Sequence, residues 1–474
     1  MMRGGLFSSP VAPPTAPPAS PPPHLDRPRM PRRPRGVEQP SGLLWVVAAL
    51  VLTHVWRLHD FSPVTRALRP TIVLTVIGLL ILVVRGGAKG ASARLRSPIS
   101  LLFIALVALA IAGLPFSLDP ADAAQYFASR FLPHVLVGLL IAASVRSIRD
   151  AEFLVVTALV GAVAYNLFMH ITVPVGPGGR WDLLRYREVL RYYDVNDLAL
   201  MLVVMMPLTL YFMRAGVPTP RRVLAAACFA LFAFSLIRTG SRGGFVGFAV
   251  VFVYLLVTYR AVSARTRLFG ALAVVAAIAV GGQTYLSRLQ TIVSPSLDYN
   301  VTAETGRLAM WRRGIDYLAD RPLVGLGIGQ FRTAERRIWS LARRQRMTGR
   351  QPPPARGAHN MFLQIAVELG VPALLVFVVL LGTTWRTLTR LRDARTLAGS
   401  PGSALAGAFT ASLLGLCVCG FFLHAAFFPV SPMLFGFAVA LAAVHVARPY
   451  APHAPPLRRG GLSASNERAP GAGV

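Results

Sequence analysis

The chain has few of the residues that build disulfides, metal clusters and paired acidic catalytic sites. It contains 3 cysteines in 474 residues, and Cys228, Cys417 and Cys419 all fall inside apolar stretches without metal-type spacing. We therefore expect no disulfide and no metal cluster. Asp and Glu number 19 against 49 Lys and Arg, and the acidic residues of the loops are scattered. This scatter disfavours the carboxylate pairs of glycosidases and the sites of two-metal enzymes.

Charged residues of any kind are also scarce. Only 14% of the residues are charged, whereas 54% are apolar and the mean hydropathy is +0.55. Soluble domains of ordinary size cannot bury that much apolar surface, so we expect an integral membrane protein. Lys89 is the only lysine, which makes the preference for arginine weak evidence of function. The formal net charge of +30 does not indicate nucleic-acid binding, because most arginines lie in short segments between apolar stretches.

Apolar stretches recur along most of the chain and predict an all-α polytopic membrane protein with about 12 transmembrane helices. Several are shorter than the roughly 20 residues that a span needs, so their helices extend into the flanks or are partly buried in protein. The predicted spans are Leu43–Trp56, Ala67–Val84, Ile99–Phe116, Leu132–Val145, Phe153–Ile171, Leu198–Met213, Val223–Ile237, Gly243–Val257, Leu268–Gln283, Met361–Leu381, Ala404–Phe422 and Val430–Val446.

One membrane domain is expected over residues 41–447, between two tails. Residues 1–40 and 448–474 are rich in proline and arginine and are expected to be disordered cytoplasmic tails. By the positive-inside rule, the short loops with most of the basic residues face the cytoplasm. The basic groups of these loops lie at 85–96, 146–149, 214–222, 260–267 and 386–395.

The longest loop, residues 284–358, then faces away from the cytoplasm. Its thirteen arginines do not contradict this, because long loops cross a membrane regardless of their charge. Apolar residues recur at helical spacing from Leu308 to Leu318, and Pro322 ends the pattern, so an amphipathic helix is predicted there. A second amphipathic helix is predicted over 333–346.

The glycine-rich segment Gly325–Phe331 suggests a dinucleotide-binding loop at first sight. However, Gln330 occupies the position of the third glycine, and no strand precedes the segment. We therefore interpret it as a flexible turn between two surface helices.

Arg242 lies in the segment Arg238–Gly244, between two apolar stretches that leave almost no loop. It must therefore sit at or just below the membrane surface, where an arginine is unfavourable unless it is paired or faces water. An interfacial arginine that extends toward the headgroups is the ordinary alternative. The flanking glycines favour a functional role, because they allow a ligand or another backbone to approach closely.

Arg307 opens the first amphipathic helix, where the backbone amides of the helix N-terminus also attract anions. Its guanidinium can form two parallel hydrogen bonds with a phosphate. The ordinary alternative is a solvated basic residue in a loop that contains many of them.

His359 directly precedes a helix that is expected to begin near Asn360. A neutral imidazole suits proton transfer near pH 7, and the surrounding arginines disfavour the imidazolium form, which keeps the histidine a base. A hydrogen-bonded histidine at the membrane interface, without a catalytic role, is the alternative.

Four pieces of the chain, in this order between about Tyr192 and Gly370, together resemble the O-antigen ligase superfamily. This superfamily includes O-antigen ligases, O-antigen polymerases and membrane O-oligosaccharyltransferases. The pieces are Asp194–Ala199, Ser241–Gly244, Arg307–Gly327 and His359–Gly370.

The resemblance implies transfer of a glycan from an undecaprenyl-diphosphate carrier to an acceptor hydroxyl, without a metal or other cofactor. The active site would face the periplasm, in a multi-pass protein of the bacterial inner membrane. Arg242 and Arg307 would neutralise the diphosphate leaving group and His359 would act as the base, with Arg238 and Asn360 as further diphosphate contacts. The acceptor would be lipid A-core, a growing polysaccharide or a protein, and no nucleic acid would take part.

Three alternatives remain open at this point. The first, within the same family, is an O-antigen or exopolysaccharide polymerase, or a protein O-oligosaccharyltransferase. The second is a polysaccharide or lipid transporter or flippase, which would show ionisable residues at mid-span and broken helices in matched halves. The third is a non-catalytic scaffold, in which removal of His359 would change nothing.

Overall fold

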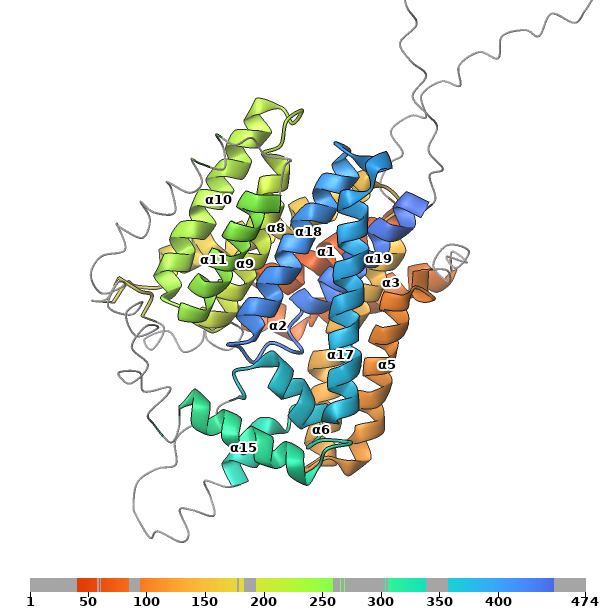
Figure 1. Ribbon diagram of the computed structural model, residues 1–474, viewed down its shortest axis with the longest axis vertical. Helices are drawn as coiled ribbons and strands as arrows, with labels where there is room; N and C mark the ends of the chain where they lie inside the picture. Colours follow the sequence, from red (N-terminus) through yellow and green to blue (C-terminus); the bar gives the residue numbers. More distant parts are fainter. Residues whose placement is uncertain are drawn as a thin grey trace, which may run out of the picture. The chain divides into compact units, whose positions relative to one another are not determined.

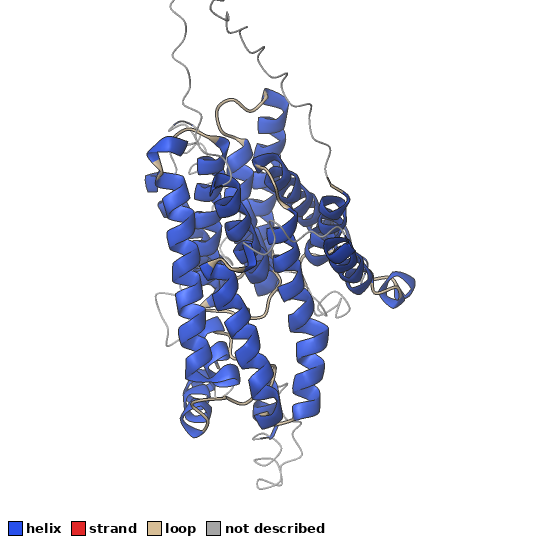
Figure 2. Ribbon diagram, turned by 90° about the vertical axis from the view of Figure 1, so that its right-hand side faces the viewer, coloured by secondary structure: helices blue, strands red, loops and turns tan. Residues whose placement is uncertain are grey.

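The computed structural model describes residues 41–57, 59, 61–84, 94–176, 179–182, 193–258, 265, 268, 303, 306–337 and 357–446. Within these ranges the regular secondary structure is helical, and the only β-type pairing is an isolated bridge between Val175 and Trp181 (Figure 2). The α-helices are α1 (Gly42–Trp56), α2 (Pro63–Ala67), α3 (Pro70–Val84), α5 (Pro98–Gly113), α6 (Pro120–Tyr126), α7 (Leu132–Ser144), α8 (Ile148–Thr172), α9 (Val195–Phe212), α10 (Thr219–Thr239), α11 (Arg242–Thr258), α15 (Arg307–Asp320), α17 (Met361–Asp393), α18 (Pro401–Gly420) and α19 (Val430–Val446) (Figure 1).

Eight helical segments in the described ranges are long and apolar enough to cross a membrane, and three shorter apolar helices accompany them. The prediction of an all-α polytopic membrane protein is therefore confirmed. Eleven of the twelve predicted spans coincide with helices, whereas Leu268–Gln283 lies outside the described residues except for Leu268. The total of about 12 stays a prediction. The eight longer segments are Pro63–Val84, Pro98–Phe116, Pro120–Ser144, Ile148–Thr172, Val195–Phe212, Thr219–Thr239, Met361–Asp393 and Pro401–Gly420.

Side-chain caps explain where several helices begin. Ser147 and Asp150 form a reciprocal capping box at the start of α8, and Asp194 and Asp197 form another at the start of α9. Each pair satisfies backbone amides that have no partner inside the helix. Proline at the first position of α18, Pro401, is also compatible with a helix start, because its missing N–H is not needed there.

One of the central helices of the bundle is α9, which packs against α8, α10, α11 and α18. In its most apolar window 72% of the residues are buried, compared with 11% for the segment that contains α3. A helix that is apolar on all sides belongs in a core, and exposed apolar residues on a spanning helix suit a lipid environment. Close contact with α18 is possible because Gly415 lies against Val203, where a Cβ atom would come within 2.9 Å of Val203 Cγ1.

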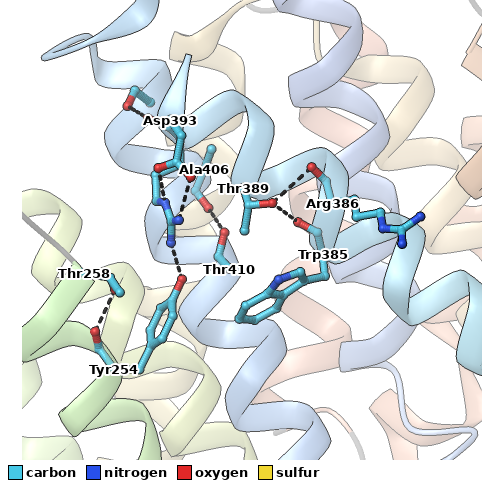
Figure 3. A network of polar contacts seen from close by, with 10 residues as sticks. Tyr254, Thr258, Trp385, Arg386, Thr389, Asp393, Ala406 and Thr410 are labelled. Carbon is cyan, nitrogen blue, oxygen red and sulfur yellow. Dashed lines mark hydrogen bonds and ion pairs between the residues drawn. The ribbon is translucent and has the colours of Figure 1, made fainter. Parts of the chain in front are cut away.

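One end of the bundle is where α7, α9, α11, α17 and α19 finish. Arginines at this end connect neighbouring parts of the chain. Arg94 donates to the Ala142 carbonyl at 2.8 Å, and Arg214 pairs with Glu152 at 3.1 Å. Arg392 pairs with Asp393 at 2.7 Å and donates to the Tyr254 hydroxyl. Figure 3 shows the last of these groups, with Tyr254 of α11 and Asp393 of α17 labelled. These arginines belong to, or adjoin, the basic loops that the positive-inside rule predicts to be cytoplasmic.

The opposite end, where α1, α8, α10 and α18 finish, also contains α15. The predicted amphipathic helix is confirmed as α15, which packs against α17 (Figure 1). Residues 331–337 are also helical and cover the start of the second predicted helix, while 338–346 lie outside the described part of the chain. The buried Glu335 ties the two helices together, because it accepts hydrogen bonds from Arg313 at 2.7 and 2.9 Å and from the Tyr317 hydroxyl at 2.9 Å.

The glycine-rich segment is a turn between two helices, as predicted, but it is bound to α17 rather than flexible. Leu326 donates to the Val367 carbonyl at 2.8 Å, and Gly327 donates to the Glu368 carbonyl at 2.9 Å. Gly325, Gly327 and Gly329 all have positive φ angles, between +67° and +100°, which L-residues with side chains rarely adopt. The segment is therefore a fixed part of this end of the bundle.

Candidate functional site

Arg242 lies at the start of α11, which is bound to the start of α9. Ser241 caps α11, because its Oγ accepts a hydrogen bond from the Gly244 amide at 3.2 Å. The same hydroxyl donates to Asn196 Oδ1 at 2.8 Å. Two of the four motif pieces, Asp194–Ala199 and Ser241–Gly244, are therefore in direct contact, and Arg242 is half-buried beside that contact.

Arg238 lies one turn away, at the end of α10. Its Nη1 donates to the Gly179 carbonyl at 2.8 Å, and its guanidinium lies over the Phe234 ring, 4.8 Å from the centroid. The Trp181 amide donates to the Arg238 carbonyl at 3.0 Å. Arg238 thus fixes the loop that follows α8 to the end of α10, and its binding of a diphosphate stays a prediction.

The glycines that follow Arg242 allow α11 to lie close to the end of α18. A Cβ atom at Gly243 would lie 2.9 Å from Phe422 Cβ, and one at Gly247 would overlap the Cys419 sulfur. The close approach that these glycines permit is therefore made by another part of the chain. This part, residues 419–424, is called the α18 C-terminal segment below.

The α18 C-terminal segment also contacts the residues around His359. A Cβ atom at Gly420 would lie 2.8 Å from Met361 Cε, and one at Gly357 would lie 2.7 Å from His424 Cγ. The Ala358 amide donates to His424 Nδ1 at 3.1 Å. Residues on both sides of His359 are thus held by the segment that contacts Gly243.

His359 itself is half-buried and has a φ angle of +47°. A left-handed backbone at a residue other than glycine costs of order 1–3 kcal/mol, persists only where neighbours enforce it, and is often found at functional sites. Asn360 enforces it on one side, because its Oδ1 accepts hydrogen bonds from the amides of Phe362 and Leu363 at 2.9 and 3.0 Å.

This geometry confirms that a helix begins next to Asn360 and that His359 adjoins the cap. The Asn360 carboxamide oxygen is engaged by the first turn of α17. Contact of Asn360 with a diphosphate therefore stays a prediction.

Arg307 is the first residue of α15, as predicted from the sequence. Trp311, one turn later, donates from Nε1 to the Ala358 carbonyl at 2.9 Å, and its ring lies 5.7 Å from that of Phe421. Residues four apart are neighbours on a helix surface, so Arg307 projects from the same face as Trp311. The helix that begins at Arg307 is thereby bound to the segment that contains His359.

One short segment contacts residues next to two of the three predicted catalytic residues and the helix that begins with the third. A direct neighbour of Arg242, Gly243, contacts Phe422; the helix of Arg307 contacts Phe421 through Trp311; and the neighbour of His359, Ala358, binds His424. The α18 C-terminal segment therefore links the three parts of the chain that carry Arg242, Arg307 and His359, and the distances between these three side chains stay a prediction.

Two residues of this region had no chemical role in the sequence interpretation, although Glu368 lies in the motif piece His359–Gly370. His424 lies in the link between α18 and α19 with 16% of its side chain exposed, and Glu368 is fully buried in α17. The Glu368 carboxylate accepts hydrogen bonds from the amides of Gly329 at 2.6 Å and Phe331 at 3.3 Å. A histidine in a short apolar link between two predicted spans is the signal that would have drawn attention to His424.

The electrostatic surroundings of His424 keep it neutral. Burial, then the positive charge of Arg332, and then the proximity of the titratable His359 hold the pKa of its imidazole well below the usual range. Arg332 comes from the helical residues 331–337, so the outer helices contribute to the charge around this site. Such a concentration of arginines attracts anionic substrates.

The described residues contain no group of three or more His, Cys, Asp or Glu side chains that could hold a metal ion. The expectation of a metal-free reaction stays a prediction, and the cationic groups named above are the candidates to bind an anion.

A protein-family model described as O-antigen ligase matches residues 227–378. The matched stretch contains three of the four motif pieces, together with Arg242, Arg307 and His359. It confirms the resemblance to the O-antigen ligase superfamily, a family of glycan-transferring enzymes. No curated protein matches the chain.

Proposed function

We propose, from the match of residues 227–378 to the O-antigen ligase family model, that the chain transfers a glycan from an undecaprenyl-diphosphate carrier to an acceptor hydroxyl. The reaction would take place at the periplasmic face of the bacterial inner membrane. The observation that supports this most directly is that the segments containing Arg242, Arg307 and His359 all contact the α18 C-terminal segment.

In the proposed reaction the acceptor oxygen attacks the anomeric carbon of the glycan, and the bond from that carbon to the diphosphate oxygen breaks. The electron pair leaves with the diphosphate, so negative charge grows there in the transition state. Arg242 and Arg307 stabilise that charge, because fixed cations aimed at a departing anion favour the transition state over the ground state. Both residues open helices, whose N-terminal amides add further positive potential.

His359 would take the proton of the acceptor hydroxyl. Its imidazole is the side chain best suited to proton transfer near neutral pH. The left-handed backbone at His359 fits this role, because it lifts the residue out of the helical path just before α17 begins. By this proposal the arginines supply the charge neutralisation that a divalent cation provides in other transferases.

The acceptor would be lipid A-core, as in a ligase, with a growing polysaccharide or a protein as the alternatives. The domain that carries the reaction would be residues 41–447, with residues 284–358 as its periplasmic loop. A transporter would instead use broken helices as part of an ion or substrate path. The break in α17 at Gly370 is filled by protein, since Val371 donates to the Pro322 carbonyl at 2.8 Å and a Cβ atom at Gly370 would overlap the Leu323 carbonyl.

The test is reconstitution of the full-length protein with an undecaprenyl-diphosphate-linked glycan and separate candidate acceptors. His359→Ala, Arg242→Ala and Arg307→Ala should each lower kcat/KM about a hundredfold or more, on the order of 2.7 kcal/mol. Arg312→Ala is the matched control, because Arg312 is an exposed arginine of the same helix as Arg307. Unchanged turnover in all three variants, or an equal loss in Arg312→Ala, would overturn the proposal.

A further inference from the structure

His424 lies close to two places in a part of the chain that is distant in sequence, the segment before α17 and Glu368 within α17. Its Nδ1 accepts the hydrogen bond of the Ala358 amide at 3.1 Å, and its ring lies against Gly357. Its Nε2 faces Glu368 Oε1 at 4.0 Å. The histidine thus lies between the segment before α17 and a buried carboxylate within α17.

These contacts define the protonation state of His424. A backbone amide only donates, so Nδ1 must be the unprotonated nitrogen that accepts. A neutral imidazole then carries its proton on Nε2, which faces the Glu368 carboxylate. Glu368 is itself fixed by the amides of Gly329 and Phe331, and its Oε1 lies 4.0 Å from Nε2, beyond hydrogen-bond distance.

The contact with Ala358 acts on the residue directly before His359. His359 has a left-handed backbone, which neighbouring contacts must maintain. Asn360 holds the chain after His359 through the α17 cap, while Trp311 and His424 hold the carbonyl and the amide of Ala358 before it. His424 is therefore one of the contacts that keep the strained residue in place.

We propose that His424 is a positioning residue, which holds Ala358 and His359 in the conformation that glycan transfer requires and does not itself touch the substrate. This inference rests on the proposed function, in which His359 is the base. It assigns to the link between α18 and α19 a role that the four motif pieces do not contain.

The experiment compares three substitutions of His424 in the full-length protein in lipid nanodiscs. His424→Asn keeps an oxygen acceptor close to the position of Nδ1, whereas His424→Gln moves the carboxamide toward the position of Nε2, and His424→Ala removes both. His445→Asn is the matched control, because His445 lies at the opposite end of the bundle, beside Gly402. The two measurements are the kinetics of glycan transfer and the deuterium uptake of the peptide that covers residues 357–363.

We expect His424→Ala and His424→Gln to lower kcat at least tenfold with little change in the donor KM, and to raise deuterium uptake at 357–363. His424→Asn should restore kcat to within about threefold of the wild type and restore slow exchange. The Asn and Gln variants carry the same carboxamide, so their comparison still decides the proposal if His424→Ala does not fold.

Equal losses in the Asn and Gln variants would overturn the positioning role, because acceptor position would then be irrelevant. Faster exchange with unchanged kcat would overturn it as well, and so would unchanged exchange in His424→Gln. If the wild type transfers no glycan, the proposed function fails, while the exchange measurement still reports whether His424 holds the Ala358 segment.

Discussion

The indole nitrogen of Trp311 donates a hydrogen bond to the carbonyl oxygen of Ala358 at 2.9 Å, across 47 residues of sequence. This bond joins α15, which begins with Arg307, to the residue before His359. The Trp311 side chain therefore joins the helix of the arginine that would bind a leaving group to the residue before the histidine that would act as the base.

Replacement of Trp311 by phenylalanine should weaken this connection selectively. Trp311→Phe keeps an aromatic ring against Phe421 but leaves the buried Ala358 carbonyl without the indole donor, which costs about 1–3 kcal/mol. We expect kcat for glycan transfer to fall about tenfold and the melting temperature to fall by a few degrees. Initial rates in nanodiscs would measure the effect, with Trp385→Phe, at the opposite end of α17, as the control. A Trp311→Phe enzyme as fast as wild type would show that the bond does not position His359.

The glycine-rich turn should tolerate no side chain at Gly327. Its φ angle is +100°, and a Cβ atom would overlap Ser117 Oγ, so Gly327→Ala combines backbone strain with a steric clash. We expect a loss of about 3 kcal/mol in the free energy of unfolding, seen as a lower melting temperature in detergent. Gly382→Ala is the control, because Gly382 is an exposed helical glycine with no atom within 4 Å of a Cβ position. That change should stabilise the helix by roughly 0.5–1 kcal/mol, and a similar result at Gly327 would contradict the structure.

Acidification should destabilise the protein partly through His424, which lies outside the spanning helices. Its pKa in the folded protein is well below the usual 6.5, so the folded state binds fewer protons than the unfolded state in the interval between the two values. The free energy of unfolding therefore falls as the pH drops below about 6.5. The titratable groups around the imidazole are Arg332, His359 and Glu368, and Arg332 and His359 lower its pKa.

The measurement is the melting temperature between pH 7.5 and 5.5 for the wild type and His424→Asn. Asparagine does not titrate in this range, so its melting temperature should decline less steeply. Parallel curves for the two proteins would show that the pKa of His424 is the same in the folded and unfolded states.

The two ends of the bundle should face opposite sides of the membrane. Asp320, at the end of α15, and Arg395, just after α17, are both exposed and lie at opposite ends. Asp320→Cys should react with a membrane-impermeant maleimide added to spheroplasts, whereas Arg395→Cys should react only after the cells are opened. The natural cysteines are a low background, since Cys419 is buried and Cys228 and Cys417 lie within spanning helices. The reverse labelling pattern would place the candidate site in the cytoplasm and exclude the proposed reaction.

Local patterns in the sequence predicted the local structure. The spacing from Leu308 to Leu318 with Pro322 after it predicted α15, and the position of Asn360 predicted where α17 begins. The apolar stretches predicted eleven of the helices that the structure describes. Each of these features depends on residues within one or two turns of each other, through periodicity, capping and helix termination, and a linear pattern records such relationships.

Only the tertiary structure decided which segments meet and what each glycine and histidine contacts. Gly243 appeared to leave room for a ligand but lies against Phe422, and Gly325–Phe331 appeared to be a free turn but binds Glu368. His424 had no motif around it and became important because it binds Ala358, 66 residues earlier in the chain. Contacts of this kind arise when helices far apart in sequence pack side by side. A pattern within one helix determines which face is apolar, but not which neighbour covers it.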